Sequence, residues 1–338
     1  MNKLFLTNSC IDETAATTKR RTFFAVGIVF LLVYMIGSTA ASVISTTPLY
    51  GYIFKDKEIM DIINSGITDY EEYNTAITSA LERLYANMPP WMNAFSLIST
   101  VATIIAVMIY CCKIEKRRPF TLGFLRKGAV PEYISGLFIG LFMFSVAYGI
   151  AILSGEITFG GFDFQVNIGM IVLFFLGFLV QGASEEILLR GYFFVSGAAN
   201  SSVAVSVFVS SGLFAAMHLG NPGISFLAII NLFLFGVFAA LYFLRRGSIW
   251  GICAVHSVWN FAQGNVFGCK VSGMNMGESL FTVNENGGTL WSGGAFGPEG
   301  GLCVTVVLVI GITVLTFMKN KNIPEFFVRK DKEFISAY

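Results

Sequence analysis

Residues 168–220 read IGMIVLFFLGFLVQGASEEILLRGYFFVSGAANSSVAVSVFVSSGLFAAMHLG, two apolar runs separated by the polar turn Asn200-Ser201-Ser202. A helix that crosses a hydrocarbon core of about 30 Å needs about 20 mainly apolar residues. Backbone groups in lipid must be hydrogen-bonded within the protein. The two runs are therefore predicted to be membrane helices, joined at the turn as an antiparallel hairpin.

The whole chain has the composition of a membrane protein. Of its 338 residues, 55% are hydrophobic and 13% are charged, and the mean hydropathy is +0.70. Soluble domains carry about 25% charged residues, so this composition argues against a water-soluble fold. The net charge of +1 gives no indication of nucleic-acid binding. The six cysteines have neither a metal-binding nor a disulfide-framework spacing.

Eight apolar stretches are candidate membrane spans. They are 22–46, 91–112, 131–153, 168–198, 201–219, 224–244, 248–266 and 301–318. None of them alternates apolar and polar residues over ten positions, as a membrane barrel strand does. The sequence therefore predicts an all-α, polytopic membrane helix bundle of about eight transmembrane helices.

Basic residues indicate the orientation of these spans. They cluster before the first span and in the segments 113–127, 245–246 and 319–332. Cytoplasmic segments carry an excess of Lys and Arg, so both termini are predicted to be cytoplasmic. Apart from Arg190 within the fourth span, the remaining basic residues fall in the predicted outside loops. These are Lys55, Lys57, Arg83 and Lys270.

This topology divides the chain into five parts. They are a cytoplasmic tail (1–21), an N-terminal transmembrane hairpin (22–130) with an outside loop (47–90), a membrane core (131–266), an outside loop (267–300), and a last helix with a cytoplasmic tail (301–338). The first apolar run is longer than that of a typical signal peptide, which favours a membrane anchor. In the first outside loop, Thr68 and Glu71 have the spacing of a capping box and predict an amphipathic helix. That helix is expected to lie on the membrane surface or to cover the bundle.

Three ionisable residues, Glu185, Glu186 and Arg190, interrupt the apolar stretch 168–198. An ionisable group in a bilayer costs about 2.5–3.5 kcal/mol on insertion scales, so such residues are functional candidates. On a helix, Glu186 and Arg190 are four residues apart and can pair. Glu185 points about 100° away from Glu186. One carboxylate can therefore be held by the arginine while the other is free for chemistry.

Both histidines of the chain lie in apolar segments, His218 in FAAMH and His256 in HSVWN. A single histidine in a membrane helix is more often a packing residue than a functional one. Two of them beside a Glu-Glu pair favour a functional site. Asn260 follows His256 by four residues and shares its helical face, and Phe214 is expected to pack beside His218.

Hairpin geometry predicts that these groups meet. Residues equidistant from a hairpin turn lie opposite each other, and Glu185 and His218 are centred on position 201.5. The next turn, at 245–247, places His256 about nine residues, or roughly 13 Å, along the following helix. The predicted pocket therefore opens to the cytoplasmic side, where the basic residues of that turn lie.

The strings EEILLR, FAAMH and HSVWN resemble three signatures of the CAAX-processing and bacteriocin-immunity (CPBP) family of intramembrane proteases. These signatures are E-E-x-x-x-R, F-x-x-x-H and H-x-x-x-N. They occur here in the family's order, on successive apolar helices, with no departure at a motif position. The resemblance covers about residues 130–265.

The resemblance implies hydrolysis of a peptide bond near the cytoplasmic membrane face. It makes Glu185 the general base on a water that His218 helps to hold, while His256 and Asn260 donate hydrogen bonds to the oxyanion. Glu186 and Arg190 would brace the site. A metal-free mechanism is favoured because the H-E-x-x-H spacing of zinc proteases is absent. A zinc site remains an alternative, with Glu185, Glu186, His218 and His256 as its ligands.

Two other functions stay open at this point. Buried Glu and His residues also form ion pathways, so a transporter or proton-coupled carrier is one alternative, although no inverted repeat is visible. A non-enzymatic immunity protein is the other. For a protease, the expected substrate is a peptide or protein, such as a lipidated protein or a bacteriocin or pheromone precursor. The expected location is the bacterial plasma membrane, with membrane lipids around the protein.

Overall fold

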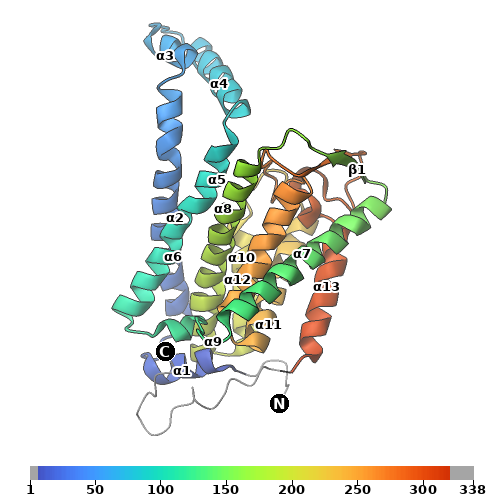
Figure 1. The fold of residues 1–338 in the computed structure, drawn as a ribbon. Coiled ribbons are helices and arrows are strands. Elements are labelled where there is room, and N and C mark those ends of the chain that lie inside the picture. Colours follow the sequence, from blue (N-terminus) through green and yellow to red (C-terminus); the bar gives the residue numbers. More distant parts are fainter. Residues whose placement is uncertain (1–6, 320–338) are drawn as a thin grey trace.

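The computed structural model describes residues 7–319, most of which lie in helices that run side by side (Figure 1). Each of the eight predicted spans falls on helical residues. The helical segments are α2 (Phe23–Ile53), α5 (Pro90–Ser99) with α6 (Val101–Met108) and η2 (Ile109–Ile114), α7 (Ala129–Leu153), α8 (Ile168–Glu186) with η4 (Ile187–Phe194) and α9 (Val195–Asn200), α10 (Val203–Met217), α11 (Phe226–Arg246), α12 (Ile249–Phe261) with η5 (Ala262–Val266), and α13 (Leu302–Phe317). The predicted tail residues 1–6 and 320–338 lie outside the described residues.

Five of these helical segments are long and apolar enough to cross a membrane: α2, α5 to η2, α7, α8 to α9, and α11. Helices α10 and α13 are also apolar but shorter, with 15 and 16 residues. The mostly helical fold is confirmed, and these helices support an integral membrane protein. The count of eight spans and the cytoplasmic termini stay predictions.

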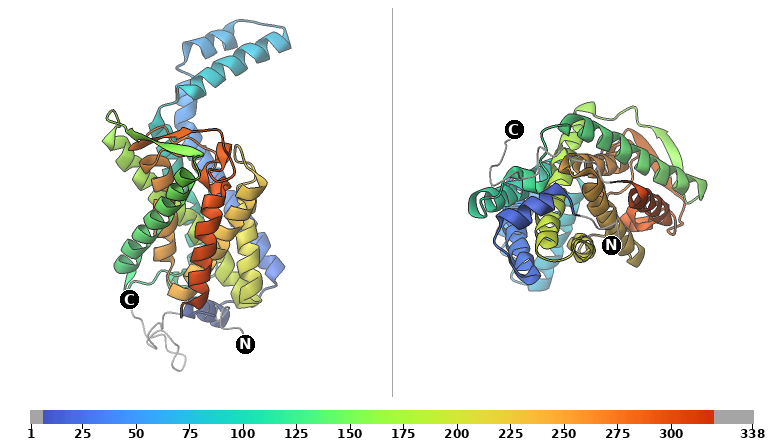
Figure 2. Two further views of the ribbon diagram at one scale, coloured as in Figure 1. Left: turned by 90° about the vertical axis from the view of Figure 1, so that its right-hand side faces the viewer. Right: turned by 90° about the horizontal axis from the view of Figure 1, so that it is seen from below.

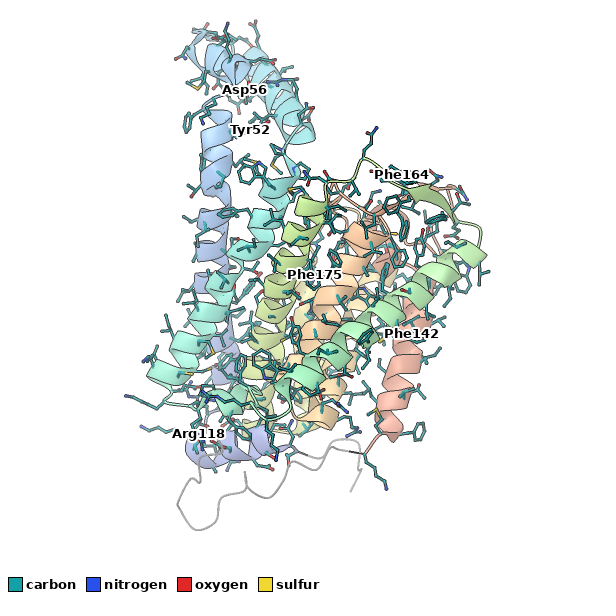
Figure 3. The ribbon with its side chains drawn as sticks, in the orientation of Figure 1. Tyr52, Asp56, Arg118, Phe142, Phe164 and Phe175 are labelled. Atoms are coloured by element: carbon teal, nitrogen blue, oxygen red, sulfur yellow. The ribbon has the colours of Figure 1, made fainter. Side chains whose placement is uncertain are left out.

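Large apolar side chains on the outside of the bundle agree with a lipid environment. Phe138 and Phe142 on α7 are 70% and 69% exposed. Figure 3 shows Phe142 pointing away from the neighbouring helices. Apolar surface of this kind is stable against lipid chains and unstable against water.

The two ends of the bundle differ in structure (Figures 1 and 2). Helix α1 (Ser9–Thr17) lies across one end, which we call the α1 end. At the other end, the sheet end, β1 (Ile157–Phe162) pairs antiparallel with β2 (Phe281–Glu285). The all-α prediction missed this sheet because its two short strands come from segments more than 100 residues apart. In the predicted orientation, the α1 end is cytoplasmic.

The predicted outside loop 47–90 forms a helical hairpin. Helix α2 continues past the predicted boundary at residue 46, and α3 (Lys57–Asn64) and α4 (Tyr70–Ala86) project beyond the bundle at the sheet end (Figure 1). The first turn of α4 is capped by Asp69, whose Oδ1 accepts a hydrogen bond of 2.8 Å from the Glu72 N–H, and not by Thr68. Helix α4 buries its apolar face against α3, so the prediction that it covers the bundle is wrong.

Small residues allow α12 to pack closely between α7 and α8. A Cβ at Gly140 of α7 would collide with the carbonyl of Val255, and a Cβ at Gly182 of α8 would lie 2.6 Å from Ser257 Oγ. Small residues at helix contacts let membrane helices approach closely. Residues 251–260 of α12 are consequently all buried.

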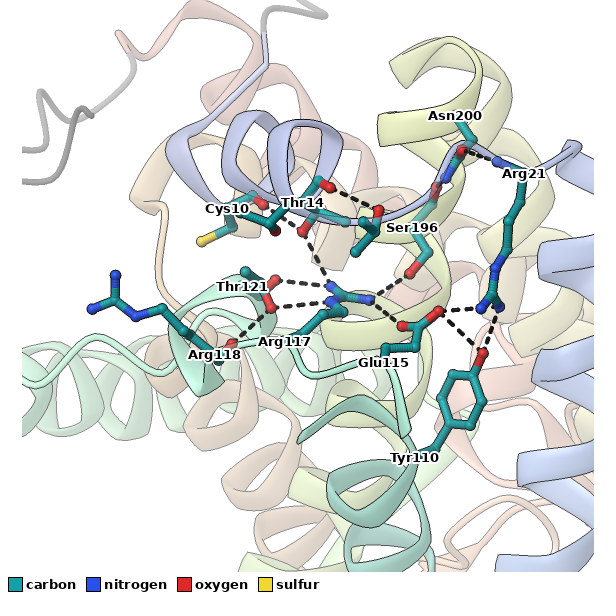
Figure 4. Close-up of polar contacts among 12 residues, drawn as sticks. Cys10, Thr14, Arg21, Tyr110, Glu115, Arg117, Arg118, Thr121, Ser196 and Asn200 are labelled. Carbon is teal, nitrogen blue, oxygen red and sulfur yellow. Dashed lines mark hydrogen bonds and ion pairs between the residues drawn. The ribbon is translucent and has the colours of Figure 1, made fainter. Parts of the chain in front are cut away.

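A buried arginine holds α1 against the α1 end (Figure 4). The Arg117 guanidinium donates hydrogen bonds to Ser196 Oγ at 2.8 Å, Thr121 Oγ1 at 3.1 Å and Thr14 Oγ1 at 3.2 Å. It also pairs with Glu115 at 3.3 Å. The described part of the predicted N-terminal tail is therefore docked against the bundle through Thr14.

This docking predicts low reactivity for Cys10. The side chain is fully buried, and burial, followed by the charge of Glu13, raises the pKa of its thiol to about 12. Because the thiolate is the reactive species, wild-type Cys10 should react slowly with a maleimide at pH 7.5. The Arg117→Ala substitution should undock α1 and raise the rate about tenfold or more, since it removes the hydrogen bonds that join Thr14 of α1 to Thr121 and Ser196 through the guanidinium.

The rate is measured by mass spectrometry of the peptide that contains Cys10. Arg118→Ala is the control, because Arg118 is partly exposed and its ion pair with Glu13 is long, at 3.8 Å. Equal labelling of Cys10 in wild type and Arg117→Ala would contradict the docking role.

Candidate active site

The candidate site lies where two helices change from α-helical to π-helical hydrogen bonding. Segment η4 begins directly after Glu186, and η5 begins two residues after Asn260. Single π-helical turns inside helices are rare and occur frequently at functional sites. Both turns follow the polar residues that the sequence singles out.

Glu186 is the centre of a buried ion-pair cluster. Its Oε1 accepts a hydrogen bond from Arg190 Nη1 at 3.0 Å and lies 2.8 Å from His256 Nδ1. The side chains of Glu186 and Arg190 are both 0% exposed. Arg190 also donates to the Gly236 carbonyl on α11 at 3.2 Å and lies 5.0 Å from the ring centre of Phe214 on α10. The predicted pairing of Glu186 with Arg190 is confirmed.

This cluster fixes the orientation of His256. A carboxylate only accepts hydrogen bonds, so the 2.8 Å contact places a proton on His256 Nδ1. Nε2 then points to the other side of the ring, where Glu185 Oε2 lies 3.8 Å away. The ring of Phe235 packs edge-on against His256, with ring centres 4.9 Å apart.

Glu185 has a different environment from its neighbour in the sequence. Its Oε1 accepts a hydrogen bond of 2.6 Å from Gln181 Nε2, and Gln181 Oε1 accepts one of 3.0 Å from Asn260 Nδ2. Among the residues that the structure describes, none donates a hydrogen bond to Glu185 Oε2. The side chain is 19% exposed. One oxygen of Glu185 is therefore held by Gln181 and the other is unpaired, in a setting separate from that of Glu186.

His218 lies at the carboxyl end of α10 and approaches the site from the other arm of the hairpin. Its Nδ1 is 2.8 Å from the Phe214 carbonyl, which requires a proton on Nδ1 and leaves Nε2 without one in the neutral ring. Phe214 packs beside the imidazole with ring centres 4.8 Å apart, as predicted. The hairpin turn is also confirmed, because α9 ends at Asn200 and α10 begins at Val203.

All four predicted catalytic residues line one cavity of about 430 Å³: Glu185, His218, His256 and Asn260. Phe214 lines it as well. The lining does not include Glu186 and Arg190, and Glu186 contacts His256 through Nδ1. The cavity is of the size that binds small molecules or a short stretch of peptide.

The cavity extends in a direction that the sequence did not predict. The expected opening lay at the turn 245–247, which is at the α1 end. The lining instead continues toward the sheet end through α2, α5 and the loop 267–300, and no described residue of α1, η3 (Pro119–Leu122) or α9 takes part in it. The lining residues outside the catalytic group include a row of hydroxyls: Ser38, Ser42, Ser45, Ser96, Ser99, Thr100 and Thr103.

The four residues considered as zinc ligands do not form a metal site in this arrangement. Oε1 of Glu186 is already bound by Arg190 and His256. Within residues 7–319, no group of three or more His, Cys, Asp or Glu side chains is placed to hold a metal ion. The metal-free mechanism and the zinc alternative both stay predictions.

Sequence reasoning missed Gln181, which connects the two halves of the site. Its amide group hydrogen-bonds both Glu185 and Asn260, so it fixes the carboxylate on α8 relative to the amide on α12. A signal was present, because Gln181 is a polar residue in an apolar run and precedes Glu185 by one helical turn.

The fold and the site together define a helical membrane protein with a buried glutamate and histidine cluster facing a cavity. Residues 167–262 match the family model described as Type II CAAX prenyl endopeptidase Rce1-like. This match supports assigning the chain to the CPBP/CAAX protease family, and the matched segment contains all the candidate site residues. Searches of curated proteins and of solved structures each found no match.

The buried cluster predicts that Arg190 is required for stability. Arg190→Ala removes one partner of a buried ion pair and should destabilise the protein by about 3–5 kcal/mol. The exposed pair of Lys270 with Glu285 is the control, and Lys270→Ala should cost about 0–1 kcal/mol. Thermal melting of the purified variants in detergent measures both effects. An Arg190→Ala variant that melts at the wild-type temperature would contradict the role of the cluster.

Proposed function

We propose that this protein is an intramembrane endopeptidase that hydrolyses a peptide bond inside the cavity with Glu185 as its general base. One observation carries the proposal: Glu185 lines a cavity together with two histidines and an asparagine, and its buried Oε2 has no hydrogen-bond partner among the described residues. The family match to a CAAX endopeptidase supports the class of reaction.

The first step is activation of a water by Glu185. Glu185 Oε2 and His256 Nε2 are 3.8 Å apart, so one water can lie within hydrogen-bonding distance, about 2.8 Å, of both atoms. Glu185 takes a proton from this water as its oxygen attacks the substrate carbonyl. The unprotonated Nε2 of His218 is available to orient the same water. Proton transfer by a positioned side chain contributes about 10²–10⁴-fold to a rate.

The second requirement is stabilisation of the oxyanion. Asn260 uses one amide hydrogen for Gln181 and retains the other for a ligand. His256 donates from Nε2 when its ring is protonated, and the carboxylate of Glu186 beside Nδ1 stabilises that charge. Glu185 then passes its proton to the leaving amine, which yields a carboxylic acid and an amine; proton transfer between these products gives a carboxylate and an ammonium group.

The depth of the site supports cleavage within the membrane layer. His256 lies seven residues into α12, about 10 Å from the start of that helix at the α1 end. The cavity is lined toward the sheet end, so we propose that the substrate reaches Glu185 from that end and not through the turn 245–247. The substrate is a peptide or a protein.

Loss of either central residue should stop cleavage. Glu185→Gln removes the base and His218→Ala removes a water ligand, so the rate should fall about 10²–10⁴-fold in each variant. Purified protein is incubated in detergent with a peptide library from a digested proteome, and new peptide ends are counted by mass spectrometry. Glu285→Gln is the matched control, because that carboxylate lies on the exposed strand β2 and should leave cleavage unchanged.

Cleavage by Glu185→Gln at the wild-type rate would refute the assignment of the base. No cleavage of any library peptide by the wild-type protein would refute the protease proposal and leave the transporter and the non-enzymatic immunity protein as the alternatives.

Chelation tests the metal-free mechanism. Because Glu186 is committed to Arg190 and His256, we expect activity in excess EDTA to equal activity in buffer. The same library assay measures this, with added zinc as the second arm. Activity that is lost in EDTA and restored by zinc would overturn the mechanism and would favour the zinc alternative.

A further inference from the structure

A second carboxylate, that of Glu299, lines the same cavity. It belongs to η7 (Pro298–Gly300), between the loop of the sheet end and α13. This residue lies outside the segment 167–262 that matches the family model, and the mechanism above gives it no role.

The structure holds the Glu299 carboxylate firmly. Oε2 accepts hydrogen bonds from the backbone N–H of Ser272 at 2.7 Å and from the Ser272 hydroxyl at 2.8 Å. Asn231 of α11 donates a further hydrogen bond of 2.8 Å to the Glu299 backbone carbonyl. Both bonds to the carboxylate end on Oε2, and no described residue bonds to Oε1. One oxygen is therefore fixed and the other is left for a ligand.

Ser272 adopts a strained backbone conformation to make these bonds. Its φ is +47°, in the left-handed region that residues other than glycine rarely occupy. Such conformations cost about 1–3 kcal/mol and cluster at active sites and ligand-binding sites. The strain indicates that the position of Glu299 is determined by more than loop packing.

A short chain of hydrogen bonds also ties Glu299 to the catalytic group. The Asn221 N–H donates to the His218 carbonyl at 3.0 Å, and the Asn221 side chain donates to the Ser272 carbonyl at 3.2 Å. Ser272 in turn binds Glu299. The second carboxylate is therefore held at a fixed position relative to His218.

The cavity has the charge to receive a cation. Its described ionisable lining consists of Glu185, Glu299, His218, His256 and Tyr34, and no described lysine or arginine takes part. A carboxylate in a partly desolvated cavity favours a positively charged partner, and a charge-assisted hydrogen bond is stronger than a neutral one.

We propose that Glu299 binds an ammonium or guanidinium group of the substrate and so selects peptides with a positive charge at a fixed distance from the scissile bond. The proposal rests on the protease function above. The cation is supplied either by a Lys or Arg side chain or by the free amino terminus of the peptide. Glu299 is a specificity residue in this scheme, because it contacts the substrate away from the reacting atoms.

The test compares cleavage of charged and neutral peptides. In the proteome library, wild-type protein should cut preferentially at sites with Lys or Arg at one fixed position, or at a fixed distance from a free amino terminus. For a peptide of the preferred sequence, Glu299→Gln should lower kcat/KM about ten- to hundredfold, mainly through KM. Norleucine in place of lysine, or an acetylated amino terminus, identifies the source of the charge and should abolish the effect of the substitution.

Glutamine at position 299 still accepts hydrogen bonds from Ser272, so the loop anchor is retained. Glu278→Gln is the matched control. The Glu278 carboxylate lies at the same end of the bundle but outside the cavity, where it accepts a hydrogen bond from the Asn167 N–H. That variant should behave as wild type.

Binding provides a second measurement that does not need turnover. A fluorescent lysine-containing peptide with a free amino terminus should bind Glu185→Gln protein about ten- to hundredfold more tightly than Glu185→Gln/Glu299→Gln protein, and a norleucine peptide with an acetylated amino terminus should bind both equally. Equal affinity of the two proteins for the lysine peptide would overturn the proposal. The proposal would also be overturned if the wild-type protein cut charged and neutral peptides equally well. The same holds if Glu299→Gln reduced the cleavage of charged and neutral peptides by the same factor. Charge-selective binding without any cleavage would refute the protease function and retain the cation site.

Discussion

The contact between Glu186, Arg190 and His256 is the interaction on which the rest of the site depends. Removing charges from water costs several kcal/mol for each ion, so a buried carboxylate and guanidinium are tolerated only when they pair with each other. Here one carboxylate oxygen joins the arginine of its own helix to a histidine of α12. The pairing requires α8 and α12 to lie close together, which Gly182 permits because no side chain separates it from Ser257.

The contact of Glu186 with Arg190 and His256 places two adjacent glutamates in different environments. Consecutive residues on a helix point in directions about 100° apart, so Glu186 faces the helix contact when Glu185 faces the cavity. Fixing Glu186 therefore also fixes Glu185. The π-helical turn that begins after Glu186 changes the direction of the following side chains. Arg190 lies in this turn and hydrogen-bonds both Glu186 and the Gly236 carbonyl. Gln181 donates a hydrogen bond to Oε1 of Glu185 and so limits rotation of this carboxylate.

The parts of the site that depend on local spacing could be predicted from the sequence. The pairs Glu186–Arg190 and Phe214–His218 follow from helical periodicity, and the level of His218 follows from the turn at 200–202. The direction of the cavity could not be predicted in this way, because it depends on how α2, α5 and the loop 267–300 pack, and local spacing does not determine contacts between such distant segments. The small sheet and the docking of α1 were missed for the same reason. Each depends on contacts between segments more than 100 residues apart, such as Ile157 with Glu285 and Thr14 with Arg117.

The segment that matches the family model and the rest of the chain contribute different chemistry to the cavity. Residues 167–262 supply the carboxylate, the imidazoles and the amide that can act on a carbonyl group. The rest of the lining, from α2, α5, α6, α13 and the sheet end, supplies hydroxyl groups, a second carboxylate and apolar side chains such as Leu97, Met276 and Leu308. Hydroxyls can donate to and accept from a peptide backbone, which offers both kinds of group along its length. Several of these hydroxyls already donate to carbonyls of their own helices, as Ser38 does to Met35 and Ser99 to Ser96, so they keep a hydrogen bond when an apolar group lies against them. Contacts to a ligand can therefore change through these segments while the buried cluster of Glu186, Arg190 and His256 keeps the glutamate and histidine side chains of α8 and α12 in place.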